Sequence, residues 1–413
     1  MPDVRYMDAA LDTAPITAED ELGALSELTA PAPAVTRRPR RQSMFGGHVP
    51  EHGRPRSKAS WLVHASALLL GVLVLGTAFI ASYVGALHEP HPRSVPIAVV
   101  EDDPGAQALI SGLGDAGPFA VTSYPDAAAA ARGLADRAVY GILDTDPAAD
   151  GLRLTVAGGA APGVADLMRQ VLGTAATAAR IPLSVRDAHP PAARDPRGLT
   201  PFYLVVGWLL GGYLAATALA VIVGTVPRNG SRLGMRLAAF AVFAVLLGLA
   251  GALITGPGYG IWSHHLVSLW SVGTLVVFTS AAVTAALESW LGLAGTGLAM
   301  LLLFIVGNPG SGGVYPPEFL PGLFRDLHRW IPTGQATELV RAVEYFGGHA
   351  IARPATTLAA WAAAGLLAIL GATLALGPRR PRRPAAAAPV LAIEKAPAVE
   401  EDGAEEVAGT GAG

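Results

Sequence analysis

Cysteine is absent from the 413 residues, so disulfide bonds, thiolate nucleophiles and cysteine-ligated metals are excluded. Lysine is almost as rare, because Lys58 and Lys395 are the only two, and neither lies in a glycine-rich turn. A P-loop needs such a lysine to reach the nucleotide phosphates, so this chain cannot itself be a P-loop ATPase. Charged residues are also scarce, at 15% of the chain, against about 25% in a typical soluble domain.

Apolar residues are abundant instead: they make up 52% of the chain and gather into long runs. Runs longer than about 18 apolar residues match the hydrocarbon thickness of a bilayer. These stretches predict six transmembrane helices, at 60–87, 201–224, 236–255, 266–287, 290–306 and 355–377, because the stretch 266–306 is too long for a single span. The last two runs before the loop, from Leu266 to Val306, contain one charge, Glu288. They predict a helical hairpin that turns at 288–290, with Glu288 as a solvated cytoplasmic carboxylate.

Residues 88–199, between the first and second spans, have a different character. Short β-branched runs alternate there with helical patterns, which is typical of a small α/β domain. Helices are expected at 126–135 and 162–179, and strands at 95–100, 119–123, 138–143, 152–156 and 182–185. The predicted fold is therefore an α-helical polytopic membrane protein with one small α/β domain inserted between its first two spans.

Basic residues beside the spans predict the orientation, because short cytoplasmic flanks carry an excess of arginine and lysine. Seven basic residues at 37–58 precede the first span, a second cluster lies at 228–236, and a third follows the last span at 379–383. With six spans all three clusters fall on one side. We therefore expect a multi-pass protein of the bacterial cytoplasmic membrane, with both termini cytoplasmic and the α/β domain extracytoplasmic.

The two ends of the chain, 1–58 and 378–413, are rich in proline, alanine and charged residues and poor in large apolar side chains. Such segments cannot bury enough apolar surface to offset the entropy of ordering. We expect both to be disordered cytoplasmic tails flanking the membrane part, which comprises 60–87 and 200–377.

The loop 308–354 is too apolar and too regular for a plain connection. Apolar spacing over 323–331 predicts a short amphipathic helix, and 335–346 predicts a second. We interpret them as interfacial or re-entrant helices at the outer membrane surface. A flexible glycine-rich turn before them, and the break between them, predict an outer gate or hinge formed by Asn308, Pro309, Gly310, Gly312, Gly313, Pro332 and Gly334.

Span two contains a pattern of small residues at Gly207, Gly211 and Gly212. Small residues allow membrane helices to approach closely. This seam can serve a homodimer or packing within one bundle, and the sequence leaves both open.

Residues that could carry chemistry are few. The acidic run 101–103 could bind a cation, although carboxylates at a strand-to-helix turn are more often solvated at a helix start. His264 and His265 are expected at the membrane interface. We expect no enzymatic activity, no catalytic residues, no cofactor and no metal.

The order of these parts resembles the ABC-2 type exporter permeases, and several stretches are similar to the phage-infection-protein-like branch of bacterial membrane proteins. Those stretches are 95–103, 137–143, 154–158, 195–203 and, most specifically, GNPGSGG (307–313), PEFLP (317–321), WIPTG (330–334) and RAVEYFG (341–347). The resemblance implies export of lipophilic molecules, polysaccharides or drugs, driven by a separate ATP-binding-cassette ATPase.

Two hypotheses follow. The first is a permease that moves a lipophilic or envelope-related substrate outward; the alternative is a non-transporting envelope scaffold or receptor whose external domain binds a partner. A permease of this kind needs a cytoplasmic contact with its ATPase, and we predict that loop at Arg228, Arg232 and Arg236, although these arginines could instead only anchor the loop. The expected partners are the lipid bilayer, that ATPase and, if the glycine seam is a dimer interface, a second copy; no nucleic acid is expected.

Overall fold

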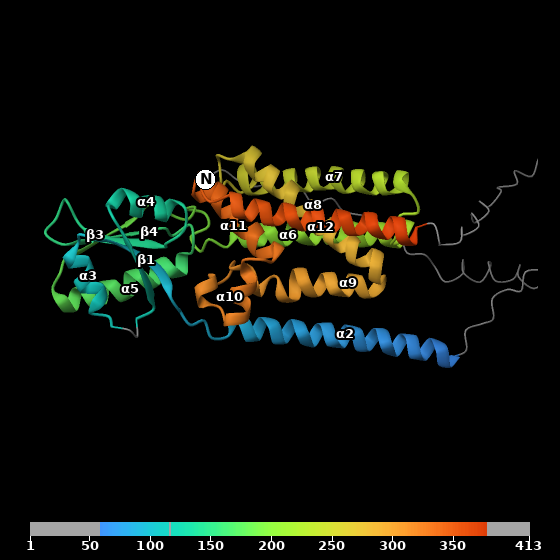
Figure 1. Ribbon diagram of the computed structural model, residues 1–413, viewed down its shortest axis with the longest axis horizontal. Helices are drawn as coiled ribbons and strands as arrows, with labels where there is room; N and C mark the ends of the chain where they lie inside the picture. The colour runs from blue at the N-terminus through green and yellow to red at the C-terminus, as the bar shows by residue number, and fades with distance from the viewer. Residues whose placement is uncertain (1–57, 115–116, 378–413) are drawn as a thin grey trace, which may run out of the picture. The chain divides into compact units, whose positions relative to one another are not determined.

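The computed structural model describes residues 58–114 and 117–377 (Figure 1). Within these ranges the protein is mostly helical, with one five-stranded sheet early in the chain. The two predicted disordered tails lie outside the described residues, except for Lys58, where the first described helix begins.

Five helices are long and apolar enough to cross a membrane. They are α2 (Lys58–Leu87), α6 (Thr200–Val223), α7 (Gly230–Leu253), α8 (Leu266–Leu291) and α12 (Ala352–Leu376). A π-helical turn, η1 (Ile254–Gly258), extends α7. α8 contacts α6, α7 and α12 and buries the largest share of its own residues, so it lies at the centre of this group (Figure 1). These helices indicate a multi-pass membrane protein.

The segment predicted as the fifth span is shorter than the other five. α9 (Leu293–Met300) continues into the π-helical η2 (Leu301–Val306) as one apolar helix. Helical backbone angles persist through Gly307 and Asn308 into η3 (Pro309–Ser311). The described residues thus contain five candidate spans and one shorter apolar helix where the sequence predicts six spans.

The hairpin between α8 and α9 turns later than the sequence predicts. α8 continues past Glu288 to Leu291, and the chain reverses at Gly292, whose φ of 61° favours glycine. Glu288 is therefore helical and only 1% exposed. Its Oε1 accepts hydrogen bonds from Thr217 of α6 at 2.8 Å and Thr296 of α9 at 3.0 Å. The prediction of a solvated carboxylate is wrong, because the extra helical residues turn this side chain into the bundle.

The α/β domain has a sheet of five strands in the order β2-β1-β3-β4-β5. β1 pairs in parallel with β2 and β3, while β4 is antiparallel to β3 and parallel to β5. All five predicted strands are confirmed, as β1 (Val95–Val100), β2 (Phe119–Tyr124), β3 (Gly141–Thr145), β4 (Leu152–Val156) and β5 (Leu183–Asp187). β3 begins later than predicted because Arg137 is left-handed, at φ 60°, and the Ala138 N–H still caps the preceding helix on the Gly133 carbonyl.

Helices cover both faces of this sheet. α3 (Pro104–Ser111) and α5 (Pro162–Ala179) share one apolar core with alternate strand residues such as Ile97 and Leu143. α4 (Ala127–Ala135) shares another with their neighbours Ala98 and Ile142, because successive strand residues point to opposite faces. In the acidic run before α3, Glu101 and Asp102 are exposed, as expected for a helix start, while Asp103 is buried and caps that helix through the Ala106 N–H at 2.9 Å.

The loop before α12 contains η4 (Pro317–Phe319), α10 (Gly322–His328) and α11 (Pro332–Tyr345). Both predicted helices are confirmed, and Pro332 begins the second one, where its missing N–H costs nothing. α10 exposes Leu323, as an interfacial helix would. α11 is largely buried and contacts α6, α8 and α12, so it belongs to the bundle and not to its surface.

Candidate functional site

The residues predicted as a gate lie close together and are all buried. Gly312 has φ 70°, and a methyl group there would lie 2.8 Å from the His328 ring. A methyl group at Gly313 would lie 2.4 Å from the Phe202 ring. The glycine-rich segment is therefore a close-packed element in this conformation, and not the flexible turn that its composition predicts.

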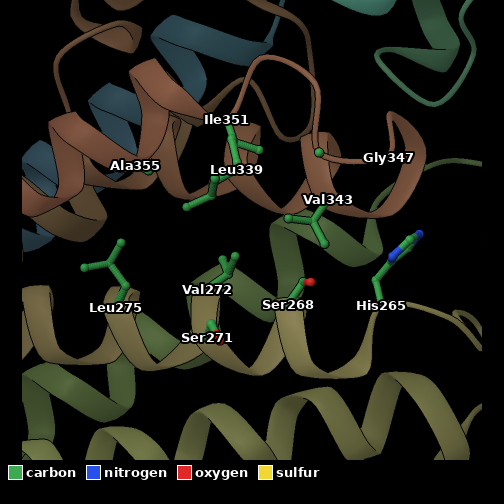
Figure 2. Close-up of a pocket in the computed structure, with 11 residues that line it drawn as sticks. His265, Ser268, Ser271, Val272, Leu275, Leu339, Val343, Gly347, Ile351 and Ala355 are labelled. Atoms are coloured by element: carbon green, nitrogen blue, oxygen red, sulfur yellow. The ribbon is translucent and has the colours of Figure 1, made fainter.

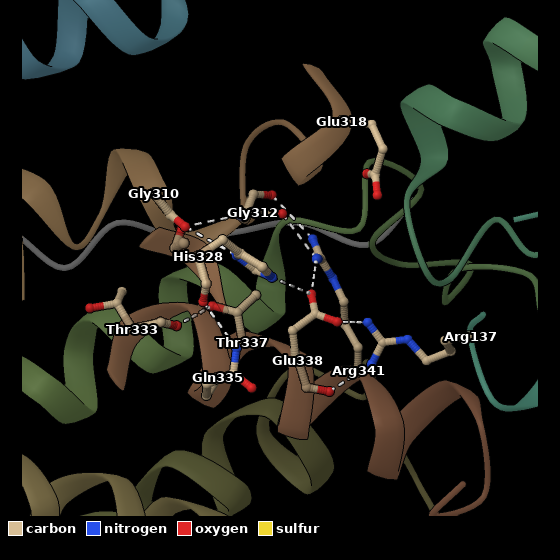
Figure 3. A network of polar contacts seen from close by, with 12 residues as sticks. Arg137, Gly310, Gly312, Glu318, His328, Thr333, Gln335, Thr337, Glu338 and Arg341 are labelled. Carbon is tan, nitrogen blue, oxygen red and sulfur yellow. Dashed lines mark hydrogen bonds and ion pairs between the residues drawn. The ribbon is translucent and has the colours of Figure 1, made fainter. Parts of the chain in front are cut away.

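A network of charges holds this segment in place (Figure 3). Arg341 of α11 donates through Nη1 to the Gly312 carbonyl at 2.9 Å and through Nη2 to the Gly313 carbonyl at 3.3 Å. The same Nη1 lies 3.1 Å from Oε1 of Glu338. Arg137, which follows α4, pairs with the other carboxylate oxygen and donates to the Glu338 carbonyl at 2.9 Å. One carboxylate thus joins the α/β domain to the glycine-rich segment.

His328 closes the network on its other side. Its Nδ1 lies 3.1 Å from the Gly310 carbonyl, which can only accept, so this nitrogen carries the proton. Burial lowers the pKa of His328 to about 4, so the ring is neutral at pH 7. Gln335 of α11 donates to the His328 carbonyl at 3.0 Å. The ring is therefore held between the glycine-rich segment and the start of α11.

An open cleft of about 940 Å³ lies beside this network and is lined by both the α/β domain and the 317–354 region. Its charged lining is mixed. It comprises Arg93, Arg137, Arg325, Arg329 and Arg353 together with Asp136, Glu318, Asp326 and Glu338. Burial raises the pKa of Glu318, whose Oε2 accepts from the Tyr140 hydroxyl at 2.9 Å. The charged part of the lining suits a polar partner.

A second hollow, of about 390 Å³, opens between helices of the bundle. Figure 2 shows Val272 and Leu275 of α8 facing Leu339 and Val343 of α11, with Ile351 nearby. The polar groups of the lining are those of His265, Ser268 and Ser271. A mostly apolar pocket of this size suits a lipophilic molecule.

The three arginines predicted as a coupling loop are in different environments. Arg232 is exposed and Arg228 is half-buried, but Arg236 is buried. Its guanidinium donates to the Thr225 carbonyl at 2.7 Å and to the Gly224 carbonyl, so it closes the turn between α6 and α7. The coupling hypothesis therefore narrows to Arg228 and Arg232.

The glycine seam of α6 faces the inside of the bundle at two of its three positions. A methyl group at Gly212 would lie 2.4 Å from the Val277 carbonyl of α8, and one at Gly211 would lie 2.1 Å from the Leu247 side chain of α7. Gly207 has no atom within 4 Å of such a group among the described residues. Gly211 and Gly212 thus serve packing within one bundle, while a dimer contact at Gly207 stays a prediction.

Sequence reasoning missed Glu288 as an internal group and Arg137 as a partner of α11. Glu288 could have been found, because it is the only charge in a long apolar stretch. Within residues 58–114 and 117–377, no histidine and carboxylate side chains gather in a way that could hold a metal ion. No family model, curated protein or solved structure matches the chain, so its class has to be inferred from its own residues.

Proposed function

We propose that this chain is the membrane permease of an ABC-2 type export system, which moves a lipophilic or envelope-related substrate outward. The observation that carries the proposal is the mostly apolar pocket between α8 and α11, inside a bundle of candidate spans. An open pocket of about 390 Å³ there can receive the apolar part of a lipophilic molecule. Because neither lysine of the chain lies in a phosphate-binding turn, a separate ATPase supplies the energy.

The permease is proposed to cross the bacterial cytoplasmic membrane six times, with both termini in the cytoplasm and the α/β domain outside. The continuous helical backbone from Leu293 through Ser311 supports the sixth crossing, since at 1.5 Å per residue it extends about 28 Å. The hydrocarbon core of a bilayer is about 30 Å thick. With six spans, the basic clusters at 37–58, 228–236 and 379–383 share the cytoplasmic side.

α11 is the proposed link between substrate and gate. Leu339 and Val343 line the apolar pocket, while Glu338 and Arg341 belong to the charged network. If α11 shifts when the pocket fills, its contacts would therefore move the glycine-rich segment and, through Arg137, the α/β domain. This arrangement supports a gate at Asn308, Pro309, Gly310, Gly312, Gly313, Pro332 and Gly334, opened by displacement of the helix and not by a loose hinge.

The proposed contact with the ATPase is the loop between α6 and α7. A hollow of about 190 Å³ lies there, lined by apolar side chains such as Val226 and Met235 and by Arg228 and Arg232. Such a surface fits a partner that presents a protruding apolar side chain flanked by acidic residues. If these arginines only anchor the loop, their removal leaves energy coupling intact.

Transport into inside-out vesicles tests the proposal. Vesicles from cells that express the chain with its ATPase should take up a fluorescent lipophilic probe when ATP is supplied, and the Arg228→Ala/Arg232→Ala variant should lose most of that uptake. The exposed pair Arg180→Ala/Arg186→Ala, on the α/β domain, is the matched control. Uptake driven by a proton gradient alone, by the purified chain, would refute the ATPase proposal and turn attention to Glu288.

The alternative is an envelope scaffold or receptor, and the charged cleft of about 940 Å³ favours it. Five arginines in that cleft would suit an acidic partner outside the membrane. The two functions separate cleanly: a receptor keeps its activity when the apolar pocket is blocked, whereas a permease does not.

A further inference from the structure

A small polar hollow of about 220 Å³ adjoins the apolar pocket of the bundle, and the two share His265. Three segments that are distant in the sequence form it. Trp262, His264 and His265 come from the loop between η1 and α8, Glu344 and Tyr345 come from the end of α11, and Pro190 and Ala192 come from the chain that leads into α6. The apolar pocket is lined by Val343 and Gly347, immediately beside Glu344 and Tyr345 in the chain.

Residues that line this hollow carry several of the buried polar atoms outside the regular hydrogen bonds of the protein. Seven buried side-chain nitrogen or oxygen atoms of the described residues are of this kind, and three belong to lining residues: Trp262 Nε1, Glu344 Oε1 and Tyr345 Oη. Trp262 is only 7% exposed. The Tyr345 hydroxyl interacts with the Trp262 indole N–H and with the Ala192 backbone N–H, so Glu344 Oε1 is the atom of the three that has no such partner. A buried carboxylate oxygen without a partner costs roughly 1–3 kcal/mol, so the Glu344 carboxyl group marks a place that a polar ligand completes.

The chemistry of the hollow selects a cation. Glu344 has no arginine, lysine or histidine nitrogen within 4.0 Å among the described ion pairs, so its carboxylate is free to accept from a ligand. The rings of Trp262 and Tyr345 meet edge to face, with centroids 6.1 Å apart and planes at 75°. Aromatic faces beside a carboxylate are the surroundings in which organic ammonium ions are bound. The same carboxylate disfavours an anion.

We infer that the two hollows together form a binding site for a lipophilic organic amine. Its ammonium lies against Glu344, Trp262 and Tyr345, and its hydrocarbon part fills the pocket between Val272 and Leu275 of α8 and Val343 of α11. Binding stands on this geometry alone. That the amine is the exported molecule rests on the proposed function.

Binding should depend on pH in a defined direction. Burial raises the pKa of Glu344 to about 7. Below that pH the carboxyl group gains a proton and loses its attraction for the ammonium; above it the carboxylate is charged. The other titratable groups that face the hollow are His264, His265 and Tyr345, with Asp195 and Arg341 acting on Tyr345 from farther away. Protonation of either imidazole adds positive charge, which weakens cation binding in the same direction.

Calorimetric titration of the full chain in nanodiscs tests the site, with empty nanodiscs subtracted. The probes are decylamine, decanol and decanoate, which share one hydrocarbon chain and differ in the head group. Decylamine should bind at least about tenfold more tightly than the other two at pH 8, and its affinity should fall about tenfold from pH 8 to pH 6. Glu344→Gln, which keeps the size of the side chain, should abolish the preference for the amine.

Two further variants keep the result interpretable. Trp262→Phe removes only the indole ring system and its N–H, and should weaken decylamine more than decanol. Asp166→Asn, on the exposed face of α5, should change nothing. Equal binding of amine and alcohol by the wild-type chain, or an unchanged preference in Glu344→Gln, would overturn the assignment. Amine binding without export would support the amine site and contradict the permease proposal. Export of a neutral lipophile without amine binding would support the permease proposal and contradict the amine site.

Discussion

Glu338→Gln removes the single negative charge that two buried arginines share. The side chains of Arg341, Arg137 and Glu338 are only 4%, 12% and 16% exposed, so solvent screens their pairing little. Burial lowers the pKa of Arg137 only to about 10, so at pH 7 its guanidinium stays charged and cannot relieve the loss by giving up a proton. Removing one partner of a buried ion pair costs about 3–5 kcal/mol. An exposed pair contributes only about 0–1 kcal/mol.

Thermal unfolding of the full chain in mild detergent, followed by tryptophan fluorescence, measures this difference. At roughly 2–4 °C per kcal/mol, the lower end of the range gives a fall of at least about 6 °C in Tm for Glu338→Gln. The control is Asp166→Asn, which breaks an exposed pair with Arg169 on α5, where Asp166 is 75% exposed. That variant should lose no more than about 2–4 °C.

Arg137→Met should change Tm in opposite directions in the wild-type and Glu338→Gln backgrounds. In the Glu338→Gln background Arg137 is an unpaired buried charge, so Arg137→Met should restore part of the lost stability. In the wild-type background Arg137→Met should instead lower Tm, because it removes one partner of the pair. If both substitutions lower Tm additively, or if Glu338→Gln shifts Tm no more than Asp166→Asn, the network does not anchor the glycine-rich segment.

Three further predictions concern His328, the glycines and the topology. The pKa of His328 is about 4 in the folded protein and about 6.5 in the unfolded chain. Up to roughly 3 kcal/mol of the free energy of unfolding is therefore present above pH 6.5 and lost as pH falls toward 4. In acid unfolding scans, His328→Gln should lose less stability over this range than the wild type. Gly312→Ala should lower Tm, because residue 312 has a positive φ and the added methyl group would collide with the His328 ring. Gly173→Ala, in the middle of α5 where no atom lies near the added methyl group, should raise the free energy of unfolding by about 0.5–1 kcal/mol. Equal effects of the two substitutions on stability would contradict the close packing at Gly312. Cysteines at the exposed positions Ser94 and Ser123 should react with impermeant thiol reagents in intact cells, while one at Ser231 should not; labelling at 231 would overturn the orientation.

Local pattern predicted the α/β domain well because β1, β3 and β4 bury alternate or continuous residues between turn residues. The same holds for α10 and α11, whose break at Pro332 follows from the missing N–H of proline. These strands and helices are determined largely by residues close together in the sequence, so the sequence alone is enough to predict them.

Long-range contacts were beyond this kind of reasoning. Arg137 and Glu338 are 201 positions apart, and nothing in either segment indicates its partner. The position of Gly292 decided whether Glu288 faces water or the bundle, and a shift of one helical turn reversed the outcome. Glu344 was visible as one charge on a short helix, but the hollow that it faces needs three separate segments to form. The gate residues were found by their glycine and proline content, which could not show that they are packed tightly.

The central claim is that the apolar pocket between α8 and α11 lies on the path of an exported molecule. Ser271→Trp tests it most directly, because this side chain would fill the pocket without adding charge. Ser66→Trp, at an exposed position of α2, places the same residue outside the pocket as a control. ATP-dependent uptake of a fluorescent lipophilic probe into inside-out vesicles should be lost in Ser271→Trp and kept in Ser66→Trp, at equal protein levels and similar Tm. Undiminished uptake by Ser271→Trp would contradict the claim.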